Sequence, residues 1–203
     1  MQVFHYHLVT SKVRLVEARY LAKLGFDLVA RYGWIEDSSH WFEPGKSWEE
    51  LDELGFRPRL VELRRGSVNV VLQPGHWDVP RVDHLGVALD DDAYLDALER
   101  ASDLEMNIQD HPGKRTFIAT EAGYRVEVHP PRDWIEEILE GSDDLRLAEL
   151  HLRAEDPDVK AAALAAIFGT EPADGDVVVG DTLVRFLPGG PSGRPELVGE
   201  VLS

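Results

Sequence analysis

Histidines that recur along the chain are the first residues whose type and spacing could do chemistry. Near the N-terminus the sequence reads FHYHLV, with His5 and His7 two positions apart. Successive side chains of a β-strand point to opposite faces, so both imidazoles would lie on the same face. Two imidazoles on one face can bind a metal ion, or they can pack as ordinary side chains. The pair alone leaves both alternatives open.

A carboxylate stands in a later strand-like segment, GYRVEVHP, where Glu127 lies between two valines. Burying an unpaired carboxylate is costly, so such a glutamate has a cation or hydrogen-bond partners, or else it faces water. With His84 it could hold a metal ion. The alternative is a hydrogen-bonded pair between two half-buried strands.

The elements that must position these residues form a repeat. Residues 2–9 alternate as a strand, and residues 11–24 carry a helical apolar stripe that stops at Gly25. Further strands are expected at 26–33, 57–65 and 67–74. From residue 81 the order recurs as strand 81–89, helix 90–104, strand 105–110 and hairpin 114–130, which turns at residues 121–123. Each unit is therefore predicted to be β-α-β-β-β.

A third, shorter pass follows an acidic connector. Strand 146–154, helix 156–169 and hairpin 176–188 are expected, and residues 196–203 could form a last strand at the edge of the sheet. We divide the chain into a first unit (1–75, with an insertion at 34–54), a second unit (80–131), a solvated acidic linker helix (132–146) and an incomplete third unit (147–203).

The repeat separates the two N-terminal histidines. The first two helices end 20 residues after His5 and His84, and the third ends 18 residues after His151. His7 has no counterpart, so we expect it to support a site or to pack beside one. Only the second unit keeps a carboxylate in its last strand, since Val184 takes that place in the third unit. We therefore interpret His151 as a duplicate without a site of its own.

Paired units of this kind, with a histidine in the first strand and a glutamate in the last, resemble the vicinal oxygen chelate superfamily. It includes glyoxalase I, extradiol dioxygenases and bleomycin-resistance proteins. The resemblance covers residues 2–130 and is carried by FHYHLV, DHLGVAL and AGYRVEVHP. It implies an α+β fold whose two units pair edge to edge into a cupped mixed sheet. It also implies that His5, His84 and Glu127 bind a divalent metal inside that cup.

Glyoxalase-like members have a fourth ligand, a carboxylate at a position where this chain has valine. The remaining two histidines and one carboxylate resemble a facial triad, which leaves positions open for substrate and dioxygen. Fe, Mn, Ni or Zn would suit such ligands, and the metal would act as a Lewis acid. Tyr124 and His129 flank the predicted site and could serve as acid or base.

These residues predict a metal-dependent enzyme that acts on a small organic molecule through bidentate oxygen coordination. The reaction would be that of a dioxygenase, an isomerase or a lyase. The alternative is a metal-free protein that binds a small molecule or antibiotic, as bleomycin-resistance proteins do. A weaker alternative is a non-catalytic module whose third unit mediates assembly. An edge strand in that unit could pair with a second copy to form a homodimer.

Composition limits the partners further. The chain has 38 acidic and 21 basic residues, a formal net charge of −17, which disfavours nucleic acid and anionic membranes. It has no cysteine, so a metal would be held by His, Asp or Glu, and a reducing cytoplasm is expected. No apolar run is long enough to span a membrane.

Aromatic residues gather in the insertion and just after the first unit. They could form a lid over the cup, or they could cap one end of the core. These residues are Trp34, His40, Trp41, Phe42, Trp48 and Trp77.

Overall fold

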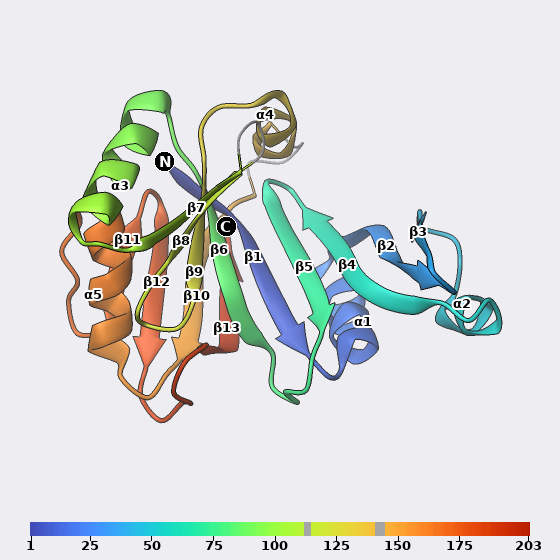
Figure 1. Cartoon of the computed structure of the whole chain (residues 1–203). Helices are drawn as coiled ribbons and strands as arrows, with labels where there is room; N and C mark the ends of the chain where they lie inside the picture. The colour runs from blue at the N-terminus through green and yellow to red at the C-terminus, as the bar shows by residue number, and fades with distance from the viewer. Residues whose placement is uncertain (112–114, 141–144) are drawn as a thin grey trace.

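The first unit has the predicted elements in the predicted order. The computed structural model describes residues 1–111, 115–140 and 145–203. Helix α1 ends at Gly25, whose left-handed conformation (φ 68°) suits glycine. The unit comprises β1 (Gln2–Thr10), α1 (Val13–Leu24), β2 (Asp27–Ile35), β3 (Ser38–Phe42), α2 (Trp48–Glu53), β4 (Arg57–Arg65) and β5 (Val68–Pro74) (Figure 1).

The insertion of the first unit contains a strand that the sequence did not indicate. Strand β3 pairs antiparallel with the end of β2 after a turn at Glu36, where φ is 52°. Its first residues are polar, so its β-structure depends on pairing with β2 rather than on an apolar alternation. Helix α2 begins with a capping box that Ser47 and Glu50 form. These elements form an arm that projects from the side of the molecule (Figure 1).

The second unit repeats this order without the insertion. Asp90 caps α3 by accepting a hydrogen bond from the backbone N–H of Ala93. The last two strands join at the predicted turn, where Gly123 has φ 84°. The unit comprises β6 (Arg81–Ala88), α3 (Asp91–Asp103), β7 (Asn107–His111), β8 (Arg115–Ala119) and β9 (Arg125–His129).

The two units pair edge to edge through their first strands. Strand β1 runs antiparallel to β6, and each also pairs in parallel with the last strand of its own unit, β5 or β9. The sheet continues outward through β4, β2 and β3 on one side and through β8 and β7 on the other. This arrangement confirms the predicted mixed sheet, and it places the first strands of both units at its centre.

The remainder of the chain comprises α4 (Asp133–Leu139), β10 (Leu147–Arg153), α5 (Pro157–Phe168), β11 (Asp176–Val179), β12 (Thr182–Leu187) and β13 (Glu196–Leu202). Strand β10 pairs in parallel with β12 and antiparallel with β13, as β1 does with β5 and β6. The prediction that 196–203 forms an edge strand is wrong, because β13 lies between β10 and β6 and reaches β6 where Glu196 pairs with Arg81.

The sequence predicted a solvated acidic linker helix, but one side of this helix is buried. Ile135 and Ile138 of α4 are buried and pack against Phe4 and Ala88. These two isoleucines therefore dock the helix against β1 and β6, while Glu136 and Glu137 remain exposed. Residues 141–144 of the predicted linker lie outside the described residues.

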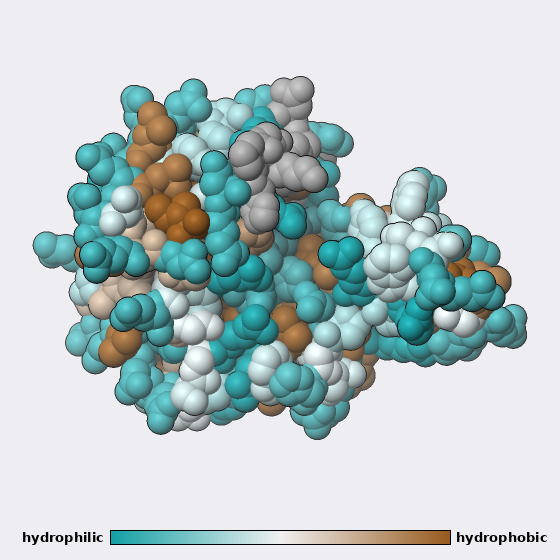
Figure 2. Space-filling view, viewed as in Figure 1, coloured by the Kyte–Doolittle hydropathy of each residue, from teal (hydrophilic) through white to brown (hydrophobic). Residues whose placement is uncertain are grey.

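The larger of two hydrophobic clusters among the described residues joins the first two units to the third. Tyr6 and Leu8 of β1, Leu85 of β6, Leu150 of β10 and Phe186 of β12 belong to one buried cluster. The alternation of β1 directs Tyr6 and Leu8 to the core and leaves the opposite face for His5 and His7. Hydrophilic residues cover most of the molecular face that Figure 2 shows. Among the described residues, no helix is both long and apolar enough to cross a membrane.

Candidate metal centre

Three neighbouring strands bring the predicted ligands together. Gly86 of β6 pairs with His5 across one strand boundary and with Glu127 across the other. His84 Nε2 lies 3.2 Å from His5 Nε2 and 3.2 Å from Glu127 Oε2. His5 Nε2 lies 4.0 Å from the same carboxylate oxygen. All three side chains are buried, so their ligand atoms surround one small volume.

These separations fit a shared divalent ion. Two ligand atoms about 2.1 Å from one ion are about 3.0 Å apart at a right angle and about 3.4 Å apart at the tetrahedral angle. The two separations at His84 fall within this range. The separation between His5 and Glu127 exceeds it by roughly half an ångström, which a small side-chain movement covers. Two imidazoles and one carboxylate are also a donor set that divalent metals accept.

Side-chain acceptors set the orientation of both histidines. His5 Nδ1 lies 2.7 Å from Asn69 Oδ1, and His84 Nδ1 lies 2.8 Å from Asp83 Oδ2. Because an oxygen acceptor takes the N–H, each Nδ1 carries a proton, which leaves Nε2 as the nitrogen that can bind a metal. Asn69 is itself oriented by donating its amide to Glu62 at 2.9 Å. Both imidazoles therefore direct Nε2 at the small volume that the three predicted ligands surround.

Asp83 reaches His84 because β6 contains a bulge. The pairing of β1 with β6 passes from His7–His84 to Leu8–Val82, so Asp83 is an extra residue. Strict alternation would have placed it on the opposite face from its neighbour. Although burial raises the pKa of Asp83, hydrogen bonds from His84 and Arg125 outweigh it and hold that pKa below its usual range.

The surrounding groups keep the Glu127 carboxylate charged and the His5 imidazole neutral. Burial raises the pKa of Glu127, but hydrogen bonds from His129 and His84 outweigh it and hold the pKa below its usual range. His129 Nε2 and Arg115 Nε lie 3.3 and 3.4 Å from Glu127 Oε1, so Oε2 is the oxygen that faces the histidines. Burial and the nearby His84 lower the pKa of His5 to about 4. At neutral pH the set is therefore one anion and an uncharged His5.

His7 also lies in the site. It pairs with His84 across the strands, and the two ring centroids are 4.7 Å apart. Within the described part of the chain, His5, His7 and His84 form a second possible ligand group, with atoms within 4.8 Å of one another. His7 Nε2, however, lies 3.1 Å from Gln73 Oε1. Two overlapping ligand sets therefore share His5 and His84, and they differ in whether Glu127 or His7 is the third member.

The ligand atoms face a cavity of about 520 Å³. This volume suits a small organic molecule. The cavity wall combines aromatic rings, among them Phe4, Tyr32 and Phe117, with amide, carboxylate and guanidinium groups. The combination provides flat apolar surfaces beside a small number of polar contacts.

Solved structures share this arrangement of strands. No family model and no curated protein matches the sequence. A halotolerant catechol dioxygenase aligns with 99% of this chain and 69% of its own at a TM-score of 0.59 and 13% identity. A variant of 4-hydroxymandelate synthase from Streptomyces coelicolor aligns with 91% of this chain and 62% of its own (TM-score 0.58, 12% identity). The chain has the vicinal oxygen chelate fold.

A third protein with the vicinal oxygen chelate fold is the Mn(II)-bound glyoxalase from Novosphingobium aromaticivorans. It aligns with 97% of this chain and 63% of its own at a TM-score of 0.51 and 13% identity. The chain thus spans 62% to 69% of the length of these three proteins. At such low identities the likeness shows the fold, and it confirms the resemblance that the sequence indicated.

One predicted residue of the candidate site lies elsewhere. Tyr124 is buried in the core, where its hydroxyl donates to the backbone carbonyl of Lys160 at 2.9 Å. The alternation that places Arg125, Glu127 and His129 in the cup sends Tyr124 to the opposite face. The structure therefore brings His129 to the site, beside Glu127, and leaves Tyr124 out of it.

The aromatic residues of the insertion do not form a lid over the cup. None of them lines the cavity, and Trp34 instead lines a shallower hollow beside Arg57. Trp48 lies beneath the guanidinium groups of Arg14 and Arg31, at 4.6 and 4.5 Å. Trp48 also donates to Glu17 of α1 and packs against the core, so this aromatic residue of the arm faces the body of the molecule and not the cup.

His151 occupies the predicted register without a comparable site. Its Nε2 lies 2.6 Å from Glu149 on the same strand, and the side chain is partly exposed. In the residues that the structure describes, no group of three possible metal ligands includes His151.

Three residues of the site were missed from the sequence: Asp83, Gly86 and Arg115. Gly86 left a usable signal, since a glycine inside a strand often marks a close approach of neighbouring groups. Asp83 left none, because a bulge has no fixed sequence pattern. Arg115 is the first residue of the short strand β8. The sequence there does not alternate between polar and apolar residues, so the face on which Arg115 lies could not be predicted.

Proposed function

We propose that this protein is a divalent-metal enzyme acting on a small organic molecule that binds through two adjacent oxygen atoms. The observation that carries the proposal is the convergence of His5, His84 and Glu127, whose ligand atoms lie within 4.0 Å of one another beside a cavity. Proteins with the same fold include a catechol dioxygenase and a Mn(II)-bound glyoxalase, which supports this class of chemistry. Fe, Mn, Ni or Zn would suit the donor set.

The chain's own residues prepare this site. Asn69 and Asp83 keep the protons on Nδ1 of the two histidines, so that both Nε2 atoms remain available. Arg115 and His129 engage one oxygen of Glu127 and leave the other directed at the histidines. When bound, the metal supplies Lewis-acid stabilisation of the anion that forms on the adjacent substrate oxygens. Ring cleavage, isomerisation and a lyase reaction can all begin from that binding mode.

His129 has a defined place in this proposal. Its ring is fully buried, packs edge-on against Phe4 and contacts Glu127. These contacts support a role in positioning the carboxylate. Its service as a catalytic acid or base stays a prediction.

Metal analysis tests the proposal directly. Protein purified without chelator should contain about one equivalent of a divalent metal. His84→Ala and Glu127→Ala should each lose it, because each removes a ligand and leaves too few donors. His151→Ala is the matched control and should retain the metal, since that histidine lies outside the cluster. Wild-type protein that takes up no divalent metal, or two ligand variants that keep it, would contradict the proposal.

A second candidate function is metal-free binding of a small organic molecule. One observation favours it: His84 already lies within hydrogen-bonding distance of Glu127 and of His5, so these polar groups have partners without an ion. Ligand binding by metal-free protein that survives both His84→Ala and Glu127→Ala would establish this alternative.

A further inference from the structure

We propose that a guanidinium cluster on one wall of the cavity binds a carboxylate of the substrate. The substrate would then be a small aromatic acid, with two adjacent oxygens for the metal and a separate acidic group for the cluster. This inference rests on the proposed function, and it names the class of molecule that the same site accepts.

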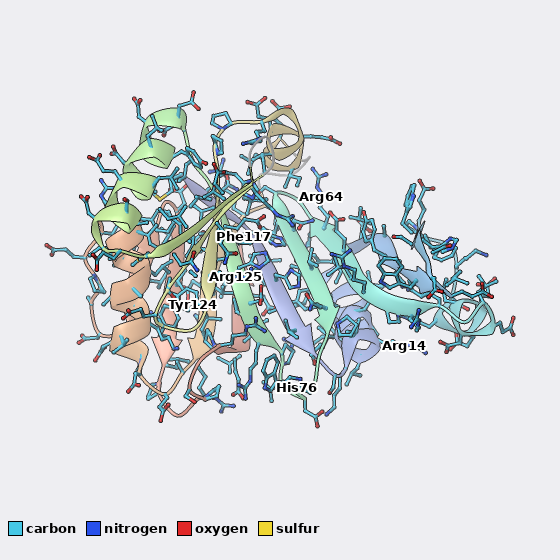
Figure 3. The ribbon with its side chains drawn as sticks, in the orientation of Figure 1. Arg14, Arg64, His76, Phe117, Tyr124 and Arg125 are labelled. Carbon is cyan, nitrogen blue, oxygen red and sulfur yellow. The ribbon has the colours of Figure 1, made fainter. Side chains whose placement is uncertain are left out.

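The cluster consists of Arg115, Phe117 and Arg125. The guanidinium carbons of Arg115 and Arg125 lie 5.3 and 4.6 Å from the centroid of the Phe117 ring. Attraction between a cation and an aromatic ring holds guanidinium groups in place at such distances. Phe117 and Arg125 lie near the middle of the sheet in Figure 3. The Phe117 centroid is 5.1 Å from that of His84, so the cluster adjoins the metal ligands.

Arg115 has donors to offer a ligand. Its side chain is 55% exposed, and its ion pair with Glu127 is made through Nε, at 3.4 Å. A guanidinium group binds a carboxylate through two parallel hydrogen bonds, which favours a planar acidic group over a single charged atom. Arg125 differs, because its Nη2 is engaged with Asp83. Arg115 is therefore the residue that would contact the carboxylate, and Arg125 would add positive charge beside it.

The charge balance of the cavity favours an anion. Three arginines and three carboxylates line it, so these groups sum to zero: Arg59, Arg115, Arg125, Glu62, Asp83 and Glu127. A divalent metal would make the cavity positive, inside a protein whose net charge is −17. The cavity would thus attract an acid that the remainder of the surface repels.

The carboxylates of the cavity already have partners. Glu62 accepts from Asn69 and from the hydroxyl of Tyr32. Asp83 and Glu127 are held by the histidines and arginines described above. The Arg59 guanidinium, in contrast, has neither a hydrogen bond nor an ion pair with any residue that the structure describes. The cations of the cavity are therefore more available to a ligand than its anions, and the rings of Phe4, Tyr32 and Phe117 suit an aromatic one.

A pair of probe ligands tests this inference. Zinc-loaded protein is titrated by calorimetry with 3,4-dihydroxybenzoate and with catechol, which share the adjacent oxygens and differ in the carboxylate. Zinc holds the site without redox chemistry. The wild type should prefer the acid, and Arg115→Gln should reduce that preference about tenfold, the scale of a hydrogen bond to a charged group. The ratio of the two affinities cancels any effect of the variant on zinc itself.

Arg146→Gln is the matched control. It removes the same charge from an exposed residue that pairs with Asp181 outside the cavity, and it should leave the preference unchanged. Equal binding of the two ligands, a preference that survives Arg115→Gln, or no binding of either ligand would overturn the inference. The same titrations on metal-free protein separate it from the proposed function. A preference for the acid that Arg115→Gln abolishes there would stand even if no metal binds.

Discussion

At the residue scale, the site depends on which nitrogen of each imidazole remains available. His5 and His84 donate the N–H of Nδ1 to the side-chain oxygens of Asn69 and Asp83. Both direct Nε2 at Glu127. His7 instead directs its Nε2 at Gln73. Burial and the neighbouring His84 lower the pKa of His7 to about 3, so it is a neutral hydrogen-bonding group at neutral pH. These contacts favour His5 as the ligand and His7 as its neighbour.

Substitution of the two histidines distinguishes their roles. His5→Ala should abolish metal retention, because it removes a ligand atom. His7→Ala should weaken metal binding by about tenfold, the lower end for residues that only support ligands. Competition titration with a chromophoric chelator measures both. If His7→Ala loses the metal while Glu127→Ala keeps it, the three histidines are the ligand set instead.

At the element scale, Gly86 allows three strands to bring their ligands together. It lies on β6 opposite His5 on β1 and Glu127 on β9. A Cβ at Gly86 would lie 2.7 Å from the Cβ of His5, closer than real contacts allow. The third unit has Gly199 opposite His151 in the same way, but a Cβ there would meet its nearest neighbour at 3.6 Å, an ordinary contact.

The two glycines therefore make a matched pair of variants. Gly86→Ala should lower the free energy of unfolding by about 1–3 kcal/mol, the usual cost of overpacking, and should weaken metal binding by displacing His5. Gly199→Ala should leave metal binding unchanged and cost less stability. Urea denaturation and chelator competition measure the two quantities. Equal losses of metal affinity in both variants would show that the close approach at Gly86 does not control metal binding.

At the scale of the whole molecule, the third unit reaches the candidate metal centre through the loop between β12 and β13. Arg194 in this loop places Nη2 2.5 Å from Asp83 Oδ1, and Asp83 holds His84. Lys160 of α5 is buried and donates to the carbonyls of Gly193 and Ala122, which ties the loop to the turn between β8 and β9. A cation from the third unit thus supports the acceptor of a predicted ligand in the second.

Removing this cation should affect the metal site from a distance. Arg194→Ala should weaken metal binding about tenfold, because Asp83 loses a partner and orients His84 less firmly. Arg194→Lys should restore part of the affinity, since it returns the charge. Arg146→Ala, at an exposed arginine just before the third unit, is the control, and chelator competition is the measurement. Equal affinities of Arg194→Ala and Arg146→Ala would exclude this coupling.

Local periodicity explains why so much of the fold was predictable. The helical stripe of α1 and the alternation of β1 and β9 are patterns among residues close in sequence, so these elements and their order could be predicted. Strand β3 was missed because its polar first residues become a strand only through pairing with β2. The burial of α4 was missed for a related reason: Ile135 and Ile138 acquire a partner surface only when β1 and β6 are side by side.

The sequence by itself determined the residue types and the repeat. The repeat distinguished His5 from His7, and the resemblance that it supports implied His5, His84 and Glu127 as ligands. The fold then placed His129 with them and Tyr124 on the other face. Only the tertiary structure decided what surrounds the three. A bulge turns Asp83 toward His84, Gly86 leaves room for His5, and Arg194 arrives from the third unit. Alternation encodes which face a side chain takes, whereas bulges and long-range contacts depend on partner strands that no local pattern specifies.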